Sequence, residues 1–97
     1  MASLWMMELD GVTADKYEDL RRQVNWEGNT PAGLQMHVAA FDERGLVLTE
    51  LWESPDLLQK YMEERFVPAI EAMQIEGQPG VELYEAYTVF TPGYTRA

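Results

Sequence analysis

The chain lacks the residues that most often carry thiol or metal chemistry. It has no cysteine and a single histidine among its 97 residues. Without cysteine it can form no disulfide, thiolate metal site or cysteine nucleophile. One histidine among scattered acidic residues does not give the ligand spacing of a zinc site. We therefore expect no bound metal.

Basic residues and long apolar segments are also scarce. The chain has 7 Lys and Arg against 17 Asp and Glu, a formal net charge of −10. Such a chain repels nucleic-acid phosphates and anionic lipid surfaces. No apolar run approaches the roughly 20 residues that a membrane span needs, and the N-terminal segment lacks the basic start of a signal peptide. We therefore expect a cytoplasmic protein with no nucleic-acid or membrane partner.

Length and composition predict one small globular domain over residues 1–97. Hydrophobic residues make up 46% and charged residues 25% of the chain, an ordinary globular balance. Thr91, Pro92 and Gly93 end the last predicted element, so residues 91–97 are expected to be a loose tail. A domain this short buries a modest fraction of its surface, so association with a second copy would help to stabilise it.

Hydrophobic periodicity and helix breakers predict the element order βαββαβ. Pro68 has no N–H to donate to the carbonyl of Glu64, which predicts a kink, or a stop followed by a short piece to Met73. This order is that of a ferredoxin-like α+β fold, a four-stranded antiparallel sheet with two helices on one face. The predicted elements are a strand at 3–9, a helix at about 14–24, a hairpin at 33–52 with its loop at 42–45, a helix from Pro55 capped by Ser54, a turn at 77–80 and a strand at 81–90.

The hairpin holds the only histidine and predicts its partner. If 42–45 is a four-residue loop, Phe41 pairs with Leu46. His37 then pairs with Glu50. Side chains alternate between the two faces of a strand, so the face of the hairpin that carries His37 is polar in part and the other is nearly all apolar. The first face has Gln35, paired with Trp52, and His37, Ala39, Leu48, Glu50 and Trp52; the second has Met36, Val38, Ala40, Val47, Thr49 and Leu51.

A four-stranded sheet with both helices on one side leaves its second face uncovered. We expect Trp52, Leu48 and aromatic residues of the last strand on that face, which makes it too apolar to remain in water. Face-to-face packing of two sheets would bury it. The sequence therefore predicts a homodimer.

The chain resembles the dimeric α+β barrel superfamily, which includes the antibiotic-biosynthesis monooxygenases. The resemblance covers nearly the whole chain and rests on the element order, on the segment ELWESP (50–55) between the third strand and the second helix, and on the aromatic and methionine content. It implies a pocket between sheet and helices for aromatic or polyketide substrates, which several members oxidise with dioxygen and no cofactor.

The match to the motifs of that superfamily is partial. Trp52 corresponds to a tryptophan that its oxygenases commonly use on the third strand. The asparagine that they commonly use on the first strand is missing here, and so is the histidine with which haem-degrading members hold iron on the second helix. We therefore expect no haem and no other cofactor.

His37 and Glu50 are the candidate catalytic residues. A carboxylate fixes the orientation of a neighbouring imidazole, which suits a general base or acid, although the pair also fits a structural cross-strand contact. Candidate substrate-binding residues are Trp52, which could stack on a ring, Gln35, which could bind an oxygen, Trp26, which could cover a pocket mouth, and Tyr84; each also fits a packing role.

The sequence thus predicts a small-molecule enzyme that acts on an apolar, ring-containing substrate. His37 would remove a proton from an acidic carbon or a phenol, with Glu50 orienting the imidazole and Trp52 holding the ring. The product anion could react with dioxygen or rearrange. The alternative is a non-catalytic dimer that binds a metabolite or assists a partner. An empty pocket of a few hundred Å³ beside His37 would favour an enzyme or binder, and a filled interior would favour a structural role.

Overall fold

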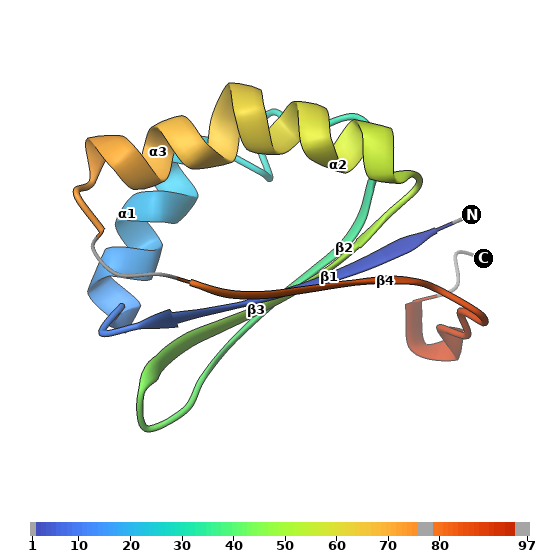
Figure 1. Cartoon of the computed structure of the whole chain (residues 1–97), viewed down its shortest axis with the longest axis horizontal. Helices are drawn as coiled ribbons and strands as arrows, with labels where there is room; N and C mark the ends of the chain where they lie inside the picture. Colours follow the sequence, from blue (N-terminus) through green and yellow to red (C-terminus); the bar gives the residue numbers. More distant parts are fainter. Residues whose placement is uncertain (1, 76–78, 95–97) are drawn as a thin grey trace.

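The computed structural model describes residues 2–75 and 79–94, which form one antiparallel sheet with its helices on a single face (Figure 1). The strand order is β2-β3-β1-β4, which confirms the predicted ferredoxin-like α+β fold. No helix in these two ranges is long and apolar enough to cross a membrane. The elements are β1 (Ser3–Asp10), α1 (Ala14–Val24), β2 (Leu34–Phe41), β3 (Gly45–Trp52), α2 (Pro55–Tyr61), a π-helical turn (Met62–Phe66), α3 (Val67–Ala72), β4 (Gly80–Glu85) and a 3-10 turn (Pro92–Tyr94).

The first two helices begin at the predicted caps. The Thr13 side chain accepts a hydrogen bond from the N–H of Lys16 at the start of α1, and the Ser54 side chain accepts one from Leu57 at the start of α2. Each cap satisfies an N–H group that has no partner within its helix. Asn25 ends α1 in the left-handed conformation, with φ of 58°. The predicted span of α1 is therefore confirmed.

The interruption predicted at Pro68 takes the form of a π-helical turn. The N–H of Val67, the residue before the proline, bonds to the carbonyl of Met62, five residues back. Inserting a π turn lets the helix pass the missing N–H of Pro68 without stopping. As a result α2, the π turn and α3 form one continuous helical segment along the sheet (Figure 1). Tyr61 and Phe66 of this segment are buried.

The register of the β2–β3 hairpin is as predicted over most of its length. His37 pairs with Glu50, and Phe41 pairs with Leu46. The Asp42 side chain accepts hydrogen bonds from the N–H groups of both Arg44 and Gly45, at 2.8 and 3.0 Å. These two bonds hold the loop in the conformation that sets the pairing, and they lower the pKa of the Asp42 carboxyl.

The pairing of Gln35 with Trp52 is wrong. Leu34 pairs with Trp52, and Met36 pairs with Leu51, so Gln35 is the extra residue of a β-bulge. Edge strands such as β2 commonly carry bulges. The bulge turns the apolar Leu34 toward the helices, where it packs on the core, and leaves Gln35 exposed. Leu34 therefore takes the position across from Trp52 that the sequence predicts for Gln35.

The predicted assignment of the two sheet faces was also wrong. The helices cover the face that carries Leu48, Glu50 and Trp52, each of which is fully buried. With Trp5 from β1 they include two tryptophans, and the burial of such large apolar side chains under the helices is favoured. The uncovered face, as far as the described residues show it, is the row of smaller side chains that the sequence placed in the core: Met36, Val38, Ala40, Val47, Thr49 and Leu51, joined by Leu4, Met6 and Tyr84.

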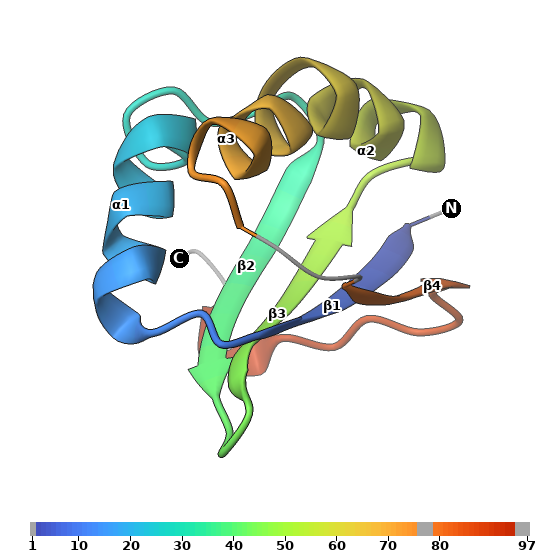
Figure 2. The same ribbon diagram turned by 60° about the vertical axis from the view of Figure 1, so that its left-hand side comes forward.

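β4 is shorter than predicted, and residues 86–90 lie outside it. Its last pair joins Glu85 to Ser3, the first residue of β1, so no partner strand remains beyond that point. The N–H of Ala86 donates to the carbonyl of Ala2 at 2.8 Å, after which the chain turns back beneath the sheet (Figure 2). Of the predicted turn at 77–80 and the predicted loose tail at 91–97, residues 77, 78 and 95–97 lie outside the described ranges.

Gly45 is the position at which the hairpin should tolerate a side chain least. Its φ is +151°, and a Cβ there would lie 2.4 Å from the carbonyl oxygen of Leu9; Gly11 also has positive φ, +78°, but a Cβ there would have open space. Gly11→Ala should lower the free energy of unfolding by about 1 kcal/mol through backbone strain alone. Gly45→Ala should lower it by about 3 kcal/mol or more, because the backbone must also move. Urea denaturation of the two variants checks this, and equal losses would contradict it.

Candidate functional site

The candidate site is built around the Glu50 carboxylate, which is fully buried between the sheet and the helices. Its Oε2 lies 2.5 Å from Nδ1 of His37 on the neighbouring strand β2. Its Oε1 accepts a hydrogen bond from the indole N–H of Trp52 at 3.0 Å. Both oxygens of the buried carboxylate therefore have a nitrogen partner, as a buried charged group requires. The predicted contact between His37 and Glu50 is confirmed.

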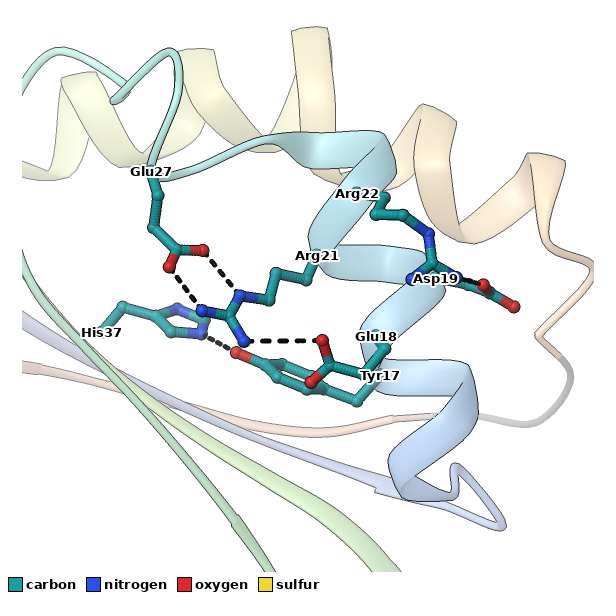
Figure 3. A network of polar contacts seen from close by, with 7 residues as sticks. All are labelled: Tyr17, Glu18, Asp19, Arg21, Arg22, Glu27 and His37. Carbon is teal, nitrogen blue, oxygen red and sulfur yellow. Dashed lines mark hydrogen bonds and ion pairs between the residues drawn. The ribbon is translucent and has the colours of Figure 1, made fainter.

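The second ring nitrogen of His37 contacts a tyrosine from α1. Nε2 lies 2.8 Å from the hydroxyl of Tyr17, and Figure 3 shows the two side chains pointing toward one another. Since a carboxylate can only accept, Nδ1 carries the proton that it donates to Glu50. In the neutral ring Nε2 is then the acceptor, and Tyr17 donates to it.

Aromatic side chains hold the imidazole in place. The Trp26 ring, from the loop after α1, lies 4.3 Å from the His37 ring between centroids. The indole N–H of Trp26 donates to the hydroxyl of Tyr61 on α2 at 2.5 Å. The His37 side chain keeps 16% of its surface exposed, so the ring is fixed but still reachable from solvent.

A hollow of about 380 Å³ opens beside His37. It lies between α1, the loop after α1 and the edge strand β2. Its walls combine apolar surface with a few convergent polar groups, which is typical of small-molecule sites. The lining residues are Tyr17, Arg21, Trp26, Glu27, Thr30, Leu34, His37 and Ala39.

An ion pair lines part of this hollow. Arg21 on α1 donates two hydrogen bonds to the carboxylate of Glu27, at 2.6 and 2.5 Å, and a longer one to Glu18 (Figure 3). The hydrogen bond from Arg21 lowers the pKa of Glu27. Because both partners are largely exposed, water screens the pair and it contributes little to stability.

Burial keeps the two tyrosine hydroxyls of the site protonated. Partial burial raises the pKa of Tyr17 above its usual value, and the nearby guanidinium of Arg21 opposes that shift in part. Burial raises the pKa of Tyr61 much further, and the Glu50 carboxylate adds to the effect. Desolvation disfavours the phenolate form. Both hydroxyls therefore keep their protons at neutral pH; Tyr17 donates to His37, and Tyr61 accepts from Trp26.

The predicted site residues are only partly brought together. His37 and Trp26 line the hollow, and Glu50, which is fully buried, contacts His37 from the interior. Trp52 touches the site from beneath, since it is fully buried, bonds to Glu50 and lies 4.8 Å from the Tyr61 ring. Its indole supports the carboxylate rather than lining the hollow.

Gln35 and Tyr84 do not join the other candidates. Gln35 is the exposed bulge residue of β2. Tyr84 on β4 pairs with Leu4 on β1, which places Tyr84 on the uncovered face of the sheet, opposite His37. There it lines a separate hollow of about 550 Å³ between the sheet and residues 85–91. A role for either residue in substrate binding stays a prediction.

The sequence reading did not identify Tyr17, Tyr61 or Arg21 as site residues. Tyr17 and Tyr61 lie in the apolar stripes of the two helices. Because the helices cover the sheet face that carries His37 and Glu50, residues of these stripes contact that pair. The stripes could have identified both tyrosines only if the covered face had been assigned correctly. Among the residues that the structure describes, no three His, Asp or Glu side chains gather so that they could hold a metal ion.

Similarity to known proteins is confined to structure. No family model matches the chain, and no curated protein has significant sequence similarity to it. SnoaB, a cofactor-independent oxygenase from Streptomyces nogalater, superposes with a TM-score of 0.66 at 12% identity over 91% of this chain and 94% of that chain. A protein from Nitrosomonas europaea, provisionally named an antibiotic biosynthesis monooxygenase, has a TM-score of 0.69 at 12% identity over 89% and 90%.

A third structure gives the same result with higher coverage. A Deinococcus radiodurans protein, again provisionally named an antibiotic biosynthesis monooxygenase, has a TM-score of 0.62 at 16% identity over 94% of this chain and 97% of that chain. Superpositions with such TM-scores establish shared architecture, but at identities this low they leave the reaction open. The chain therefore has the ferredoxin-like fold of the antibiotic-biosynthesis-monooxygenase-like proteins.

Proposed function

We propose that this protein is a small-molecule enzyme in which His37 removes a proton from an apolar, ring-containing substrate. The observation that carries the proposal is the His37–Glu50 pair at the wall of an open hollow. The Glu50 carboxylate is fully buried and the His37 imidazole is partly exposed. Glu50 therefore orients the ring from the protein interior, and a substrate would approach the ring from the hollow. A fixed imidazole beside an accessible hollow is the arrangement that general-base catalysis needs.

Each residue of the site has a definite part in the proposed step. The substrate enters the hollow and lies against Trp26. Its acidic proton passes to Nε2 of His37, which becomes an imidazolium. Glu50 accepts the Nδ1–H bond throughout, so its negative charge stabilises the positive ring that forms. Trp52 holds the other carboxylate oxygen and prevents Glu50 from turning away.

The fate of the substrate anion depends on the substrate. An electron-rich carbanion or phenolate can react directly with dioxygen, which would make the protein a cofactor-independent oxygenase. A structural neighbour is described as such an oxygenase. The anion can also rearrange and take its proton back at another atom. Both routes begin with the same proton transfer to His37, and no cofactor takes part in either.

The second candidate function is a non-catalytic protein that binds a metabolite or assists a partner. It would use the same hollow, with the His37–Glu50 pair as a structural cross-strand contact. Turnover separates the two functions, since a binding protein needs Trp26 and the walls of the hollow but not a titrating nitrogen at position 37. The open volume beside His37 favours an enzyme or binder over a purely structural protein.

The first test is the variant His37→Gln. Glutamine keeps a similar size and some hydrogen bonding but removes the titrating nitrogen. For a substrate identified by screening aromatic and polyketide-like compounds, turnover should fall at least ~100-fold. Because the glutamine amide N–H can replace the imidazole N–H as a donor to Glu50, the thermal midpoint should change little.

Lys16→Gln provides the control for this test. It also replaces a nitrogen base by an amide, but at an exposed position of α1. It should keep the activity of the unmodified protein. Undiminished turnover in His37→Gln would show that the pair is structural and that the hollow is a binding site.

We further propose that two copies of the chain pack through the uncovered face of the sheet. Val38 and Tyr84 on that face are 47% and 50% exposed, and Phe90 in the segment that follows β4 is 82% exposed. Large apolar surfaces of this kind mark association sites. A face-to-face pair of sheets would cover them with the same residues from each copy, as two-fold symmetry requires.

Sedimentation tests the dimer. Analytical ultracentrifugation at micromolar protein should give the mass of two chains. Obligate dimers commonly bury more than ~2,000 Å² in total, and an interface of that size keeps two chains associated at this concentration. Val38→Glu should shift the equilibrium toward monomer, because it introduces a charge on the apolar face. Glu82→Gln, on the same face of β4, is the control and should remain dimeric. A monomeric unmodified protein would rule out the proposed packing.

A further inference from the structure

We propose that Tyr17 is a second catalytic residue, which donates a hydrogen bond to a substrate oxygen while His37 takes the substrate proton. The substrate is then a phenol, or a carbonyl compound with an acidic C–H beside the carbonyl. This inference rests on the proposed role of His37 and adds a residue and a substrate class to it.

The position of the Tyr17 hydroxyl is the first reason. Nδ1 of His37 is held by Glu50, so Nε2 is the nitrogen that can accept a proton, and the Tyr17 oxygen lies 2.8 Å from it. A group that gives its proton to Nε2 must take the place of that hydroxyl or lie directly beside it. The displaced O–H then has an oxygen of the same group within reach.

The second reason is the way the tyrosine ring is held. The Tyr17 ring stacks on Trp26 with 6.0 Å between centroids and 19° between planes. It meets the Phe41 ring edge-on at 6.3 Å, and it lies nearly parallel to the His37 ring. Contacts on several sides keep the hydroxyl aimed at the imidazole (Figure 3), as a donor that acts in a transition state must be positioned beforehand.

The two groups divide acid and base roles between them. Partial burial raises the pKa of Tyr17, so its hydroxyl keeps its proton at neutral pH and serves as a donor. In the tautomer that Glu50 selects, Nε2 of His37 has a lone pair, which accepts the Tyr17 hydrogen bond until the substrate takes its place, so His37 serves as the acceptor. A donor next to an acceptor fits a substrate whose acidic proton lies on an oxygen or on the carbon next to a carbonyl.

The proton and electron balance is simple in both cases. With a phenol, the O–H bond breaks, the proton moves to Nε2, and the electron pair stays on the oxygen, which accepts the Tyr17 hydrogen bond. With a carbonyl compound, the C–H bond breaks, the proton moves to Nε2, and the electron pair forms an enolate whose oxygen accepts the same bond. The step uses no oxidant or reductant.

Binding of 4-nitrophenol tests the inference, because its phenolate absorbs visible light and its phenol does not. The titration is run at a pH at which most of the free probe is protonated. Unmodified protein should bind the probe and raise the phenolate absorbance. Tyr17→Phe should bind it at least ~10-fold more weakly, since a hydrogen bond to a charged oxygen is lost. 4-Nitroanisole, which has no acidic proton, should bind equally to both proteins.

Two further variants make the result decisive. Tyr87→Phe removes a phenol hydroxyl from a side chain that is 96% exposed, and it should behave as the unmodified protein. His37→Gln should no longer ionise the probe. If the Tyr17→Phe variant binds the phenolate as tightly as the unmodified protein, only the role of Tyr17 is overturned. If the His37→Gln variant still ionises the probe, the proposed function is overturned. Unmodified protein that does not ionise the probe would overturn the substrate class.

Discussion

The burial of the Glu50 carboxylate is the constraint on which the site depends. A carboxylate without solvent is stable only if its oxygens meet donors, and removing one partner of a buried pair typically costs about 3–5 kcal/mol. Here the donors are the His37 ring and the Trp52 indole, on β2 and β3. The strand register therefore sets the site, because a one-residue slip would move Glu50 and His37 to opposite faces of the sheet.

The helices complete what the hairpin begins. α1 brings Tyr17 to the second nitrogen of His37, and α2 brings Tyr61 to the Trp26 indole. The hydrogen bonds of this network then converge on Glu50: Tyr17 donates to His37, and His37 and Trp52 both donate to the Glu50 carboxylate. In the described residues no buried side-chain nitrogen or oxygen is left without a partner. A network satisfied in this way holds its members rigidly, which is the condition for the imidazole to act on a substrate.

Much of this arrangement could be predicted from sequence, because the determinants are local. The loop at 42–45 sets the pairing of His37 with Glu50, and the capping residues Thr13 and Ser54 set the starts of the helices. Gln35 was misplaced because a bulge depends on which neighbouring side chain gains more from burial, and Leu34 gains more than Gln35. The choice of covered face likewise depends on residues of more than one strand, since Trp5 of β1 is buried in the same cluster as Trp52 of β3.

Residues brought in by tertiary packing were the hardest to foresee. Tyr17 reads as an ordinary member of an apolar helix stripe, and its meeting with His37 depends on which sheet face the helix covers. The end of β4 depends on the start of β1, since a strand without a partner leaves the sheet. The hairpin part of the site is therefore determined by local sequence and can be predicted. The helical side chains are placed by tertiary packing and cannot be predicted from their own segments.

Buried Glu50 orients His37 so that Nδ1 carries the proton and Nε2 accepts one. Because the chain has one histidine, nitrogen NMR of uniformly labelled protein reports on this ring without ambiguity. At a pH where the ring is neutral, we expect a protonated Nδ1 and an unprotonated Nε2, and Glu50→Gln should weaken that preference. A neutral ring protonated at Nε2 in the unmodified protein would contradict the proposed role of His37, because Nε2 could then accept no proton from a substrate.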